Sequence, residues 1–401
     1  MKLLFFSQYF WPENFRINEI IKFLKKNNKS IVLTSYPTYP NKSLYKNYEK
    51  SDDKKFSDLE IIRVPVIPRY YNNFSIFLNY LNFKINSFFF GLFALIKKKI
   101  EIIFIFCPSP ILSALPIILL NKLFKKKVAI WVLDLWPNTV IDLKVVRNKF
   151  VIKFLKFITL FIYNNSDLIL AQSNSMKNEI EKLTRTKCAH LPSWAEQNIG
   201  ENISELAKEI DIKKNNITRI MFTGNIGQSH SFETLIKASI ILKDSHQVEW
   251  LIVGDGRWKK NLNNLIKKNK LQKQIKVYDS IPVYKIRSYF NHADALYLSL
   301  KNNDTFNKTI PGKLQTYMSS GKPIIGSISG ETKNIILNAN CGFVSDAEDH
   351  LELANNIKKF INLSEDVRKN LGLNGINYTN EHFNKEKNLN FLEMELNKLL
   401  K

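Results

Sequence analysis

Residues 299–327, SLKNNDTFNKTIPGKLQTYMSSGKPIIGS, contain the groups best suited to bind a phosphate. Thr309 can cap a helix, and Pro311 suits the first helical turn. The amides around Gly312 and Lys313 would then face a ligand at the ends of neighbouring strands. Lys301 and Lys313 can neutralise phosphates as point charges, although each is equally typical of an ordinary lysine on the protein surface. The segment predicts a diphosphate site whose candidate ligand groups are Lys301, Thr309, Pro311, Gly312 and Lys313.

Two glycine-containing loops in the same half of the chain add to this prediction. FTGNIGQSHSFETLI, residues 222–236, places Gly224 and Gly227 between a strand and a helix, and VGDGR, residues 253–257, ends the next strand. Glycine lets the backbone approach a ligand closely, and a helix start offers free N–H groups to an anion. A turn between a strand and a helix is equally typical of a structural connection that binds no ligand. The sequence here also lacks the GxGxxG dinucleotide fingerprint.

The first half has a polar loop of its own, QYFWPENFRINE, residues 8–19. Glu13, Asn14 and Arg16 follow an apolar strand there, and Trp11 offers a face to a sugar ring. The alternative is a helix start that Asn14 caps, with Glu13 in the first turn.

Asp134 ends the segment WVLD at the carboxyl end of another predicted strand, where open α/β sheets bind ligands. Its carboxylate can bind acceptor hydroxyls or assist a proton transfer. The sequence has no DxD triplet, P-loop, GxSxG or HExxH motif, so we expect no metal ion or other cofactor. Cys107, Cys188 and Cys341 form no ligand pattern, which predicts neither a disulfide nor a zinc site and fits a reducing cytoplasm.

Short apolar strands that alternate with helical patterns must position these residues, and they predict an α/β protein with two parallel sheets. The predicted strands are residues 3–7, 30–34, 61–64, 102–107, 128–134 and 168–171 in the first half, and 219–224, 249–254, 275–279, 295–300 and 323–327 in the second. We place the linker within residues 191–216. The predicted parts are an N-terminal domain over residues 1–195, a C-terminal domain over 196–380, and a helix over 381–401 that packs back toward the first domain.

The chain is strongly basic, since its 59 Lys and Arg against 36 Asp and Glu give 401 residues a formal charge of +23. This charge attracts a polyanion, an anionic membrane or a phosphorylated substrate, and part of it reflects a Lys- and Asn-rich composition. No stretch reaches the ~20 apolar residues that a spanning helix needs.

Two amphipathic segments favour a membrane surface as partner. Ser75, Asn79, Asn82 and Asn86 fall on one face of a predicted helix over residues 74–99 whose remainder is aromatic and aliphatic. A second predicted helix, residues 143–163, gathers the lysines Lys149, Lys153 and Lys156 on one side. Basic helices with aromatic faces suit an anionic bilayer, although an ordinary sheet-covering helix with a solvated edge is the alternative.

A series of motifs runs in order from residue 7 to residue 326: SQYFWPENFRINE, LTSYPTYPNKSLYKNY, RVPVIPR, WVLDLWP, SDLILAQS, LPSWAE, FTGNIG, IVGDGR, ADALYLSLK and TIPGKLQTYMSSGKPIIG. In these motifs the chain resembles glycosyltransferase family 4, and within it the WbuB-like branch of N-acetyl-L-fucosamine transferases of O-antigen and capsule assembly. The resemblance implies a GT-B fold, in which two Rossmann-like domains face each other across a cleft. It also implies metal-independent, retaining transfer from a UDP-sugar, with the donor in the second domain and the acceptor in the first.

Carried over position by position, the resemblance assigns roles to most of the residues above. The implied donor-binding residues are Arg16, Gly224, Asn225, Gly227, Lys301, Thr309, Pro311, Gly312, Lys313 and Leu314. Asp134 and Glu13 are the implied catalytic residues, and Trp11, Asn14, Lys149, Lys153 and Lys156 are expected to meet the acceptor or the membrane. The sequence departs from the family at two glutamate positions, now Lys308 and Thr316, at an Arg and a Lys that clamp the diphosphate, now Asn225 and His230, and at a histidine, now Leu133.

The leading hypothesis is therefore transfer of N-acetyl-L-fucosamine from its UDP derivative to a sugar on undecaprenyl diphosphate, with N-acetyl-D-fucosamine the first candidate for that sugar. The protein would lie peripherally at the cytoplasmic face of the bacterial membrane, where other polysaccharide-assembly enzymes are candidate partners. Another UDP- or GDP-sugar as donor, a sugar-nucleotide epimerase of the same fold, and a non-catalytic basic protein that binds membrane or RNA are the alternatives. No RNP, KH or zinc-knuckle signature supports a nucleic-acid partner.

Overall fold

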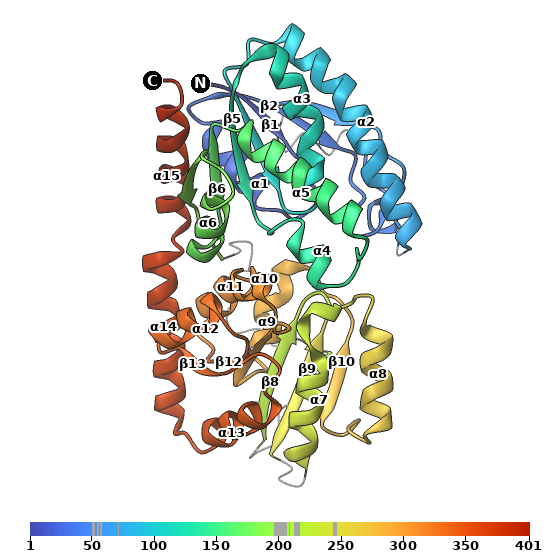
Figure 1. Ribbon diagram of the computed structural model, residues 1–401. Helices are drawn as coiled ribbons and strands as arrows, with labels where there is room; N and C mark the ends of the chain where they lie inside the picture. Colours follow the sequence, from blue (N-terminus) through green and yellow to red (C-terminus); the bar gives the residue numbers. More distant parts are fainter. Residues whose placement is uncertain are drawn as a thin grey trace. The chain divides into compact units, whose positions relative to one another are not determined.

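The computed structural model describes residues 1–49, 53, 56, 58–70, 72–195, 207, 209–211, 217–243 and 247–401. The chain divides into two compact units, Met1–Pro192 with Glu386–Lys401, and Ser193–Lys385. Figure 1 shows one sheet with covering helices in each unit. The predicted linker region lies largely outside the described residues.

The first unit is built on a seven-stranded sheet in the order β3-β2-β1-β4-β5-β6-β7, and every neighbouring pair is parallel. Its strands are β1 (Lys2–Phe6), β2 (Lys29–Ser35), β3 (Glu60–Val64), β4 (Ile102–Cys107), β5 (Lys127–Val132), β6 (Leu168–Ala171) and β7 (Lys187–His190). Its helices are α1 (Ile17–Leu24), α2 (Asn73–Lys97), α3 (Leu115–Phe124), α4 (Asn138–Asp142), α5 (Lys149–Asn164), α6 (Asn174–Glu181) and α15 (Lys385–Lys398), with 3-10 turns η1 (Lys42–Tyr45) and η3 (Ile111–Ala114).

The second unit has a six-stranded parallel sheet in the order β10-β9-β8-β11-β12-β13. Its strands are β8 (Thr218–Thr223), β9 (Val248–Val253), β10 (Ile275–Tyr278), β11 (Ala295–Ser299), β12 (Ile324–Ser327) and β13 (Gly342–Ser345). Its helices are α7 (Phe232–Ile241), α8 (Lys259–Lys268), α9 (Ile286–Phe290), α10 (Asp304–Asn307), α11 (Lys313–Ser319), α12 (Glu331–Asn338), α13 (His350–Ile361) and α14 (Glu365–His382), with 3-10 turns η4 (Gln228–His230) and η6 (Val283–Lys285).

The predicted α/β class with two parallel sheets is confirmed, and each predicted strand is present in the structure. The sequence missed β7 and β13, which lie at one edge of their sheets and have four residues each. An edge strand buries fewer side chains than a central one, so its sequence lacks a continuous apolar run. In both sheets the strand order reverses beside the first strand of the unit, β1 or β8, which is where ligands bind in open α/β sheets.

Helix α2 turns its polar side inward. Asn79 is fully buried, and its amide accepts a hydrogen bond from Gln8 Nε2 at 2.9 Å and donates one to the Ile67 carbonyl at 2.6 Å. Asn82 and Asn86 bond to the backbone of Ile67 and Pro65 in the same extended connection. These amides satisfy backbone groups that no neighbouring strand can pair.

The outward face of α2 is consequently apolar. Its exposed side chains include Phe74, Phe77, Leu81, Ile85, Phe89, Phe93 and Ile96, which recur every three or four residues along the helix. No helix in the described part of the chain is long and apolar enough to cross a membrane.

The second amphipathic segment differs from its predicted extent. Helix α5 begins at Lys149, because Asn148 caps it by accepting from the amides of Phe150 and Val151, and a helix over residues 143–148 is wrong. Lys144 has a left-handed φ of 57°, which ends the preceding turn. The three predicted lysines all lie on α5 and are exposed.

Replacement of Asn79 by leucine tests the inverted polarity of α2. Asn79→Leu leaves the Gln8 amide and the Ile67 carbonyl buried without their partner, at about 1–3 kcal/mol for each group. We expect the free energy of unfolding to fall by about 2–4 kcal/mol in urea titrations followed by circular dichroism. Ile85→Ala, at a half-exposed position of the same helix, is the control and should change it by less than about 0.5 kcal/mol. A neutral Asn79→Leu variant would contradict the inward polar face.

Candidate functional site

A pocket of about 240 Å³ lies in the second unit at the carboxyl ends of β8 and β9. It is lined by Thr223, Gly224, Val253, Gly254, Ser280, Ile281, Val283, Ile286, Gly312, Lys313, Thr316 and Tyr317. The end of β8, the segment after β10 and the start of α11 therefore meet beside the point where the strand order reverses. This is the position at which the parallel sheet predicts a ligand.

The two glycine loops leave no room for side chains where they touch. Gly224 has a φ of +119°, and a Cβ there would lie 2.7 Å from Lys313 Cε. A Cβ at Gly254 would lie 1.9 Å from the Gly224 carbonyl oxygen. Glycine is thus required at both strand ends, because the backbones and the Lys313 stem pack directly on one another.

Lys313 supplies the positive charge of this pocket. Its Nζ lies 2.9 Å from His230 Nε2 and 4.1 Å from the centre of the Phe222 ring. His230 Nδ1 lies 2.9 Å from the Ser299 carbonyl oxygen, so Nδ1 carries the proton and Nε2 accepts from the ammonium. Within the described residues, no carboxylate lies at ion-pair distance from Lys313.

Burial shifts both groups toward their neutral forms. It lowers the pKa of Lys313 to about 7. Burial, with the nearby Lys313 charge, lowers the pKa of His230 to about 3, although the bond to the Ser299 carbonyl opposes this. An anion in the pocket would favour the charged lysine, so the site is arranged to gain electrostatic stabilisation when a phosphate enters.

The structure brings together only part of the predicted donor site. Gly224, Gly312 and Lys313 line the pocket, whereas the remaining predicted donor residues of this unit, Asn225, Gly227, Lys301, Thr309, Pro311 and Leu314, are not among its lining residues. Leu314 is fully buried in the core. The Lys301 amide bonds to the Ser229 carbonyl at 2.8 Å, which places Lys301 beside the loop that carries His230.

The prediction that Thr309 caps a helix is wrong. Its hydroxyl donates to the Phe306 carbonyl at 3.0 Å, and the N-cap of α11 is Gly312, without a side-chain cap. A Cβ at Gly312 would meet no atom within 4 Å, so this end of the helix opens into the pocket.

Tyr317 is a lining residue that sequence reasoning missed. Its hydroxyl accepts from the Thr223 amide at 2.8 Å and fixes the end of β8. It looks like a core aromatic in the sequence, but it stands four positions after Lys313 and therefore on the same side of α11. That spacing is the signal that could have found it.

Glu13 in the first unit organises the loop after β1. Its carboxylate is 1% exposed and accepts from the amides of Tyr39 at 2.6 Å, Thr38 at 2.8 Å and Phe10 at 3.3 Å. Burial raises its pKa to about 7, although these amides and the Arg63 charge partly offset the shift. Both carboxylate oxygens are therefore occupied by backbone groups of two adjacent strand-end loops.

Helix α1 begins differently from the predicted alternative. Its N-cap is Arg16, with no side-chain cap, so a cap by Asn14 is wrong. Asn18 takes the organising role instead, because it accepts from the Trp11 amide at 3.0 Å and donates to the Glu13 carbonyl at 2.8 Å.

Asp134 lies two residues beyond the end of β5, so it and the Glu13 loop both follow the carboxyl ends of strands in the same sheet. Strands β1 and β5 are separated by β4 alone, which places them roughly 10 Å apart across the sheet. Thr139 Oγ1 donates to the Asp134 carboxylate, and Trp136 Nε1 donates to Ser109 Oγ at 2.9 Å beside it. Burial raises the pKa of Asp134, and hydrogen bonds from the Thr139 and Ser109 hydroxyls partly oppose that rise.

The family model described as "Glycosyl transferases group 1" matches residues 204–378, most of the second unit. Residues 204–378 are therefore similar to a group 1 glycosyl transferase domain. The pocket around Lys313 lies within these matched residues.

One curated relative is the putative colanic acid biosynthesis glycosyl transferase WcaI of Escherichia coli K12. It is 24% identical over 349 residues, which cover 80% of this chain and 82% of the relative.

Two solved structures have the same fold. Sucrose-phosphate synthase from Thermosynechococcus elongatus has a TM-score of 0.74 at 13% identity, covering 100% of this chain and 99% of that one. Anabaena HepE, determined with UDP and glucose, has a TM-score of 0.71 at 13% identity, covering 99% of this chain and 100% of HepE. The predicted GT-B class is thereby confirmed, and the group 1 domain supports glycosyltransferase activity.

The pH dependence of nucleotide binding tests the role of Lys313. Since burial lowers its pKa to about 7, the free protein loses this charge as pH rises above 7, while the phosphates of UDP are ionised throughout. We expect the affinity for UDP, measured by calorimetry, to fall about tenfold from pH 7 to 8.5. Lys313→Arg keeps its charge at every pH and should abolish this slope, whereas Lys313→Gln should bind weakly at all pH values. The same slope in Lys313→Arg would exclude Lys313 as its source.

Proposed function

We propose that the protein is a retaining glycosyltransferase that transfers a UDP-linked amino sugar to a saccharide on undecaprenyl diphosphate. N-acetyl-L-fucosamine is the proposed sugar, and N-acetyl-D-fucosamine is the proposed acceptor residue. The observation that carries the proposal is the half-buried Lys313 ammonium, which meets a neutral imidazole and an aromatic ring at the strand ends of the group 1 domain. A cation in this position stabilises a leaving nucleoside diphosphate.

The relatives support the class of donor and product. HepE was determined with UDP and glucose, which supports a UDP-sugar in the pocket of the group 1 domain. WcaI is described as a colanic acid biosynthesis enzyme, which supports a role in surface polysaccharide assembly.

In the proposed reaction, negative charge builds on the diphosphate as the bond to the sugar breaks. Lys313 and the amides at the start of α11 stabilise that charge without a metal ion. The acceptor hydroxyl attacks the same face of the sugar, and the leaving phosphate removes its proton. Among the described residues, no group of three His, Cys, Asp or Glu side chains is placed to hold a metal ion.

The two carboxylates have different proposed roles. Asp134 binds the acceptor hydroxyl, because its carboxylate lies beside Ser109 and Thr139 at the carboxyl end of β5, where parallel sheets bind ligands. Glu13 is a positioning residue, since three backbone amides already occupy its oxygens.

We further propose that the first unit docks peripherally on the cytoplasmic face of an anionic membrane. Helices α2, α3 and α5 cover one core on the same face of the sheet, so their outer sides form one surface, here called the apolar face. It carries Phe74, Phe77, Leu81, Ile85, Phe89, Phe93 and Ile96 of α2, Leu119 and Leu123 of α3, and Phe150, Phe154 and Phe157 of α5. Figure 1 shows these three helices side by side in the first unit.

Charge favours a membrane as the occupant of the apolar face. Lys149, Lys153 and Lys156 on α5 stand one position before Phe150, Phe154 and Phe157, so exposed cations border the exposed aromatics. Aromatic side chains can enter the headgroup region while the lysines bind anionic lipid, at about 1 kcal/mol per lysine.

The transferase activity is tested with undecaprenyl-diphosphate-linked N-acetyl-D-fucosamine, in EDTA, against UDP-N-acetyl-L-fucosamine, UDP-N-acetylglucosamine, UDP-glucose and GDP-fucose. We expect mass spectrometry to show one added amino sugar from a UDP donor, and NMR coupling constants of the product to show that the anomeric configuration is retained. Asp134→Asn, which keeps the Thr139 contact, should lower turnover more than tenfold. Asp58→Asn, at an exposed position, is the control and should stay within twofold of the unaltered protein. Full activity of Asp134→Asn, or no transfer with any donor, would contradict the proposal.

Membrane docking is tested by co-sedimentation with phosphatidylcholine vesicles that contain 30% phosphatidylglycerol. We expect Phe154→Ser with Phe157→Ser to lower binding at least tenfold, because both rings are more than half exposed. Lys153→Gln with Lys156→Gln should remove most of the preference for the anionic lipid. Leu183→Ser, at an exposed position outside the apolar face, should bind normally. Equal binding of all variants would exclude this surface.

A further inference from the structure

We propose that a second pocket, formed by the loop after β1 and the η1 segment after β2, binds one pyranose ring of the acceptor saccharide. This inference rests on the proposed transferase function. The pocket has a volume of about 570 Å³, within the range of small-molecule sites. It is lined by Trp11, Pro12, Ser43, Leu44, Tyr45, Lys46, Asn47 and Tyr48. We call it the aromatic pocket.

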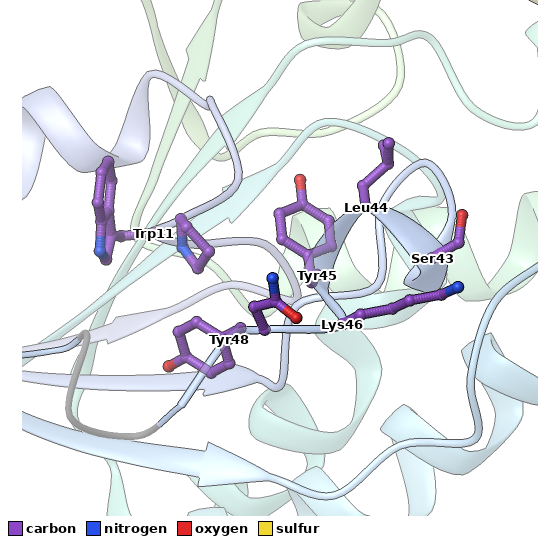
Figure 2. Close-up of a pocket in the computed structure, with 8 residues that line it drawn as sticks. Trp11, Ser43, Leu44, Tyr45, Lys46 and Tyr48 are labelled. Carbon is purple, nitrogen blue, oxygen red and sulfur yellow. The ribbon is translucent and has the colours of Figure 1, made fainter.

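The aromatic pocket has the chemistry of a sugar site. Figure 2 shows Trp11 on one side and Tyr45 and Tyr48 on the other. All three rings are half-buried, so each keeps accessible surface on which the C–H groups of a sugar ring can pack. Ser43 and Asn47 supply exposed hydrogen-bonding groups for its hydroxyls.

The wall that carries Trp11 is fixed by buried polar groups. Its amide donates to Asn18 Oδ1 at 3.0 Å, and its carbonyl accepts from Arg63 Nη2 at 2.5 Å. Arg63 is 6% exposed and also donates to the Ser35 carbonyl at 2.9 Å. The Trp11 backbone therefore cannot move without breaking bonds to a buried guanidinium.

The opposite wall is tied to the same buried groups. The Tyr48 hydroxyl donates to Asp53 Oδ1 at 2.9 Å, and Asp53 forms an ion pair with Arg63 at 2.6 Å. The Tyr45 hydroxyl donates to the Tyr39 carbonyl at 2.8 Å. The Tyr39 amide in turn bonds to Glu13, so both aromatic walls are positioned before any ligand arrives.

A neutral sugar fits this lining better than a nucleoside diphosphate. Lys46 is the one charged residue among those that line the aromatic pocket. Two ionised phosphates would meet a single exposed ammonium, whereas a sugar ring needs an apolar face with hydroxyl partners at the rim.

The experiment is saturation-transfer NMR on the full chain with the methyl β-glycosides of N-acetylglucosamine, N-acetylgalactosamine and galactose. Trp11→Ala and Tyr45→Ala should lower transfer to the bound glycoside at least fivefold. Trp11→Phe keeps an aromatic face and should retain at least half of the signal. Tyr70→Ala, at an exposed position elsewhere in the first unit, is the matched control and should not change it.

UDP binding to each variant separates the inference from the function on which it rests. Unchanged UDP affinity shows that the donor site in the second unit is intact, and an unchanged circular dichroism spectrum shows that the first unit, which carries the substitutions, is folded. Equal transfer to the unaltered protein and to Trp11→Ala, or no transfer to any glycoside from a protein that binds UDP, overturns the aromatic pocket as an acceptor subsite. Loss of the glycoside signal when UDP is added would identify the aromatic pocket as a nucleotide site and also overturn it. A chain that binds no nucleotide overturns the proposed function itself.

Discussion

The common direction of the strands is the constraint on which the rest of this structure depends. A parallel sheet places all its carboxyl ends at one edge, so loops that are far apart in the sequence must meet there. In the first unit this brings the loops after β1 and β2 together around Glu13, although residues 13 and 39 lie in different motifs. In the second unit it brings Gly224, Gly254 and Lys313 into direct contact.

The positive charge of the pocket in the second unit depends on the contact between Lys313 of α11 and His230 of η4. Residue 230 is a histidine where the resemblance implies a cation, and Lys313 reaches it from a different element, 2.9 Å away. The imidazole does not itself carry the charge, because burial and the nearby Lys313 charge lower its pKa and its Nε2 accepts from the Lys313 ammonium. Lys313, with the neutral His230 as its partner, therefore supplies the positive charge that the resemblance places at residue 230. Because the pKa of Lys313 is about 7, this charge depends on pH.

Buried polar groups also decide what the surface of the first unit looks like. The extended connection after β3 needs hydrogen-bond partners, and α2 provides them with Asn79, Asn82 and Asn86. Phe74, Phe77, Phe89, Phe90 and Phe93 of α2 are then left exposed, whereas Phe83 is buried in the core. The inward side of this helix thus combines apolar core residues with amides that bond to the neighbouring backbone, and many of its aromatic side chains face outward.

The sequence by itself determined the α/β class, the central strands and the strand-end position of Asp134 and Gly224, because buried parallel strands are continuous apolar runs and their loops follow directly. Only the tertiary structure decided what those side chains touch. Thr309 bonds to Phe306 and does not cap a helix, Tyr317 lines the pocket and bonds to Thr223, and Glu13 accepts from three amides. Burial and hydrogen bonds decide these roles, and the bonds of Tyr317 to Thr223 and of Glu13 to Thr38 and Tyr39 join segments that are far apart in the sequence.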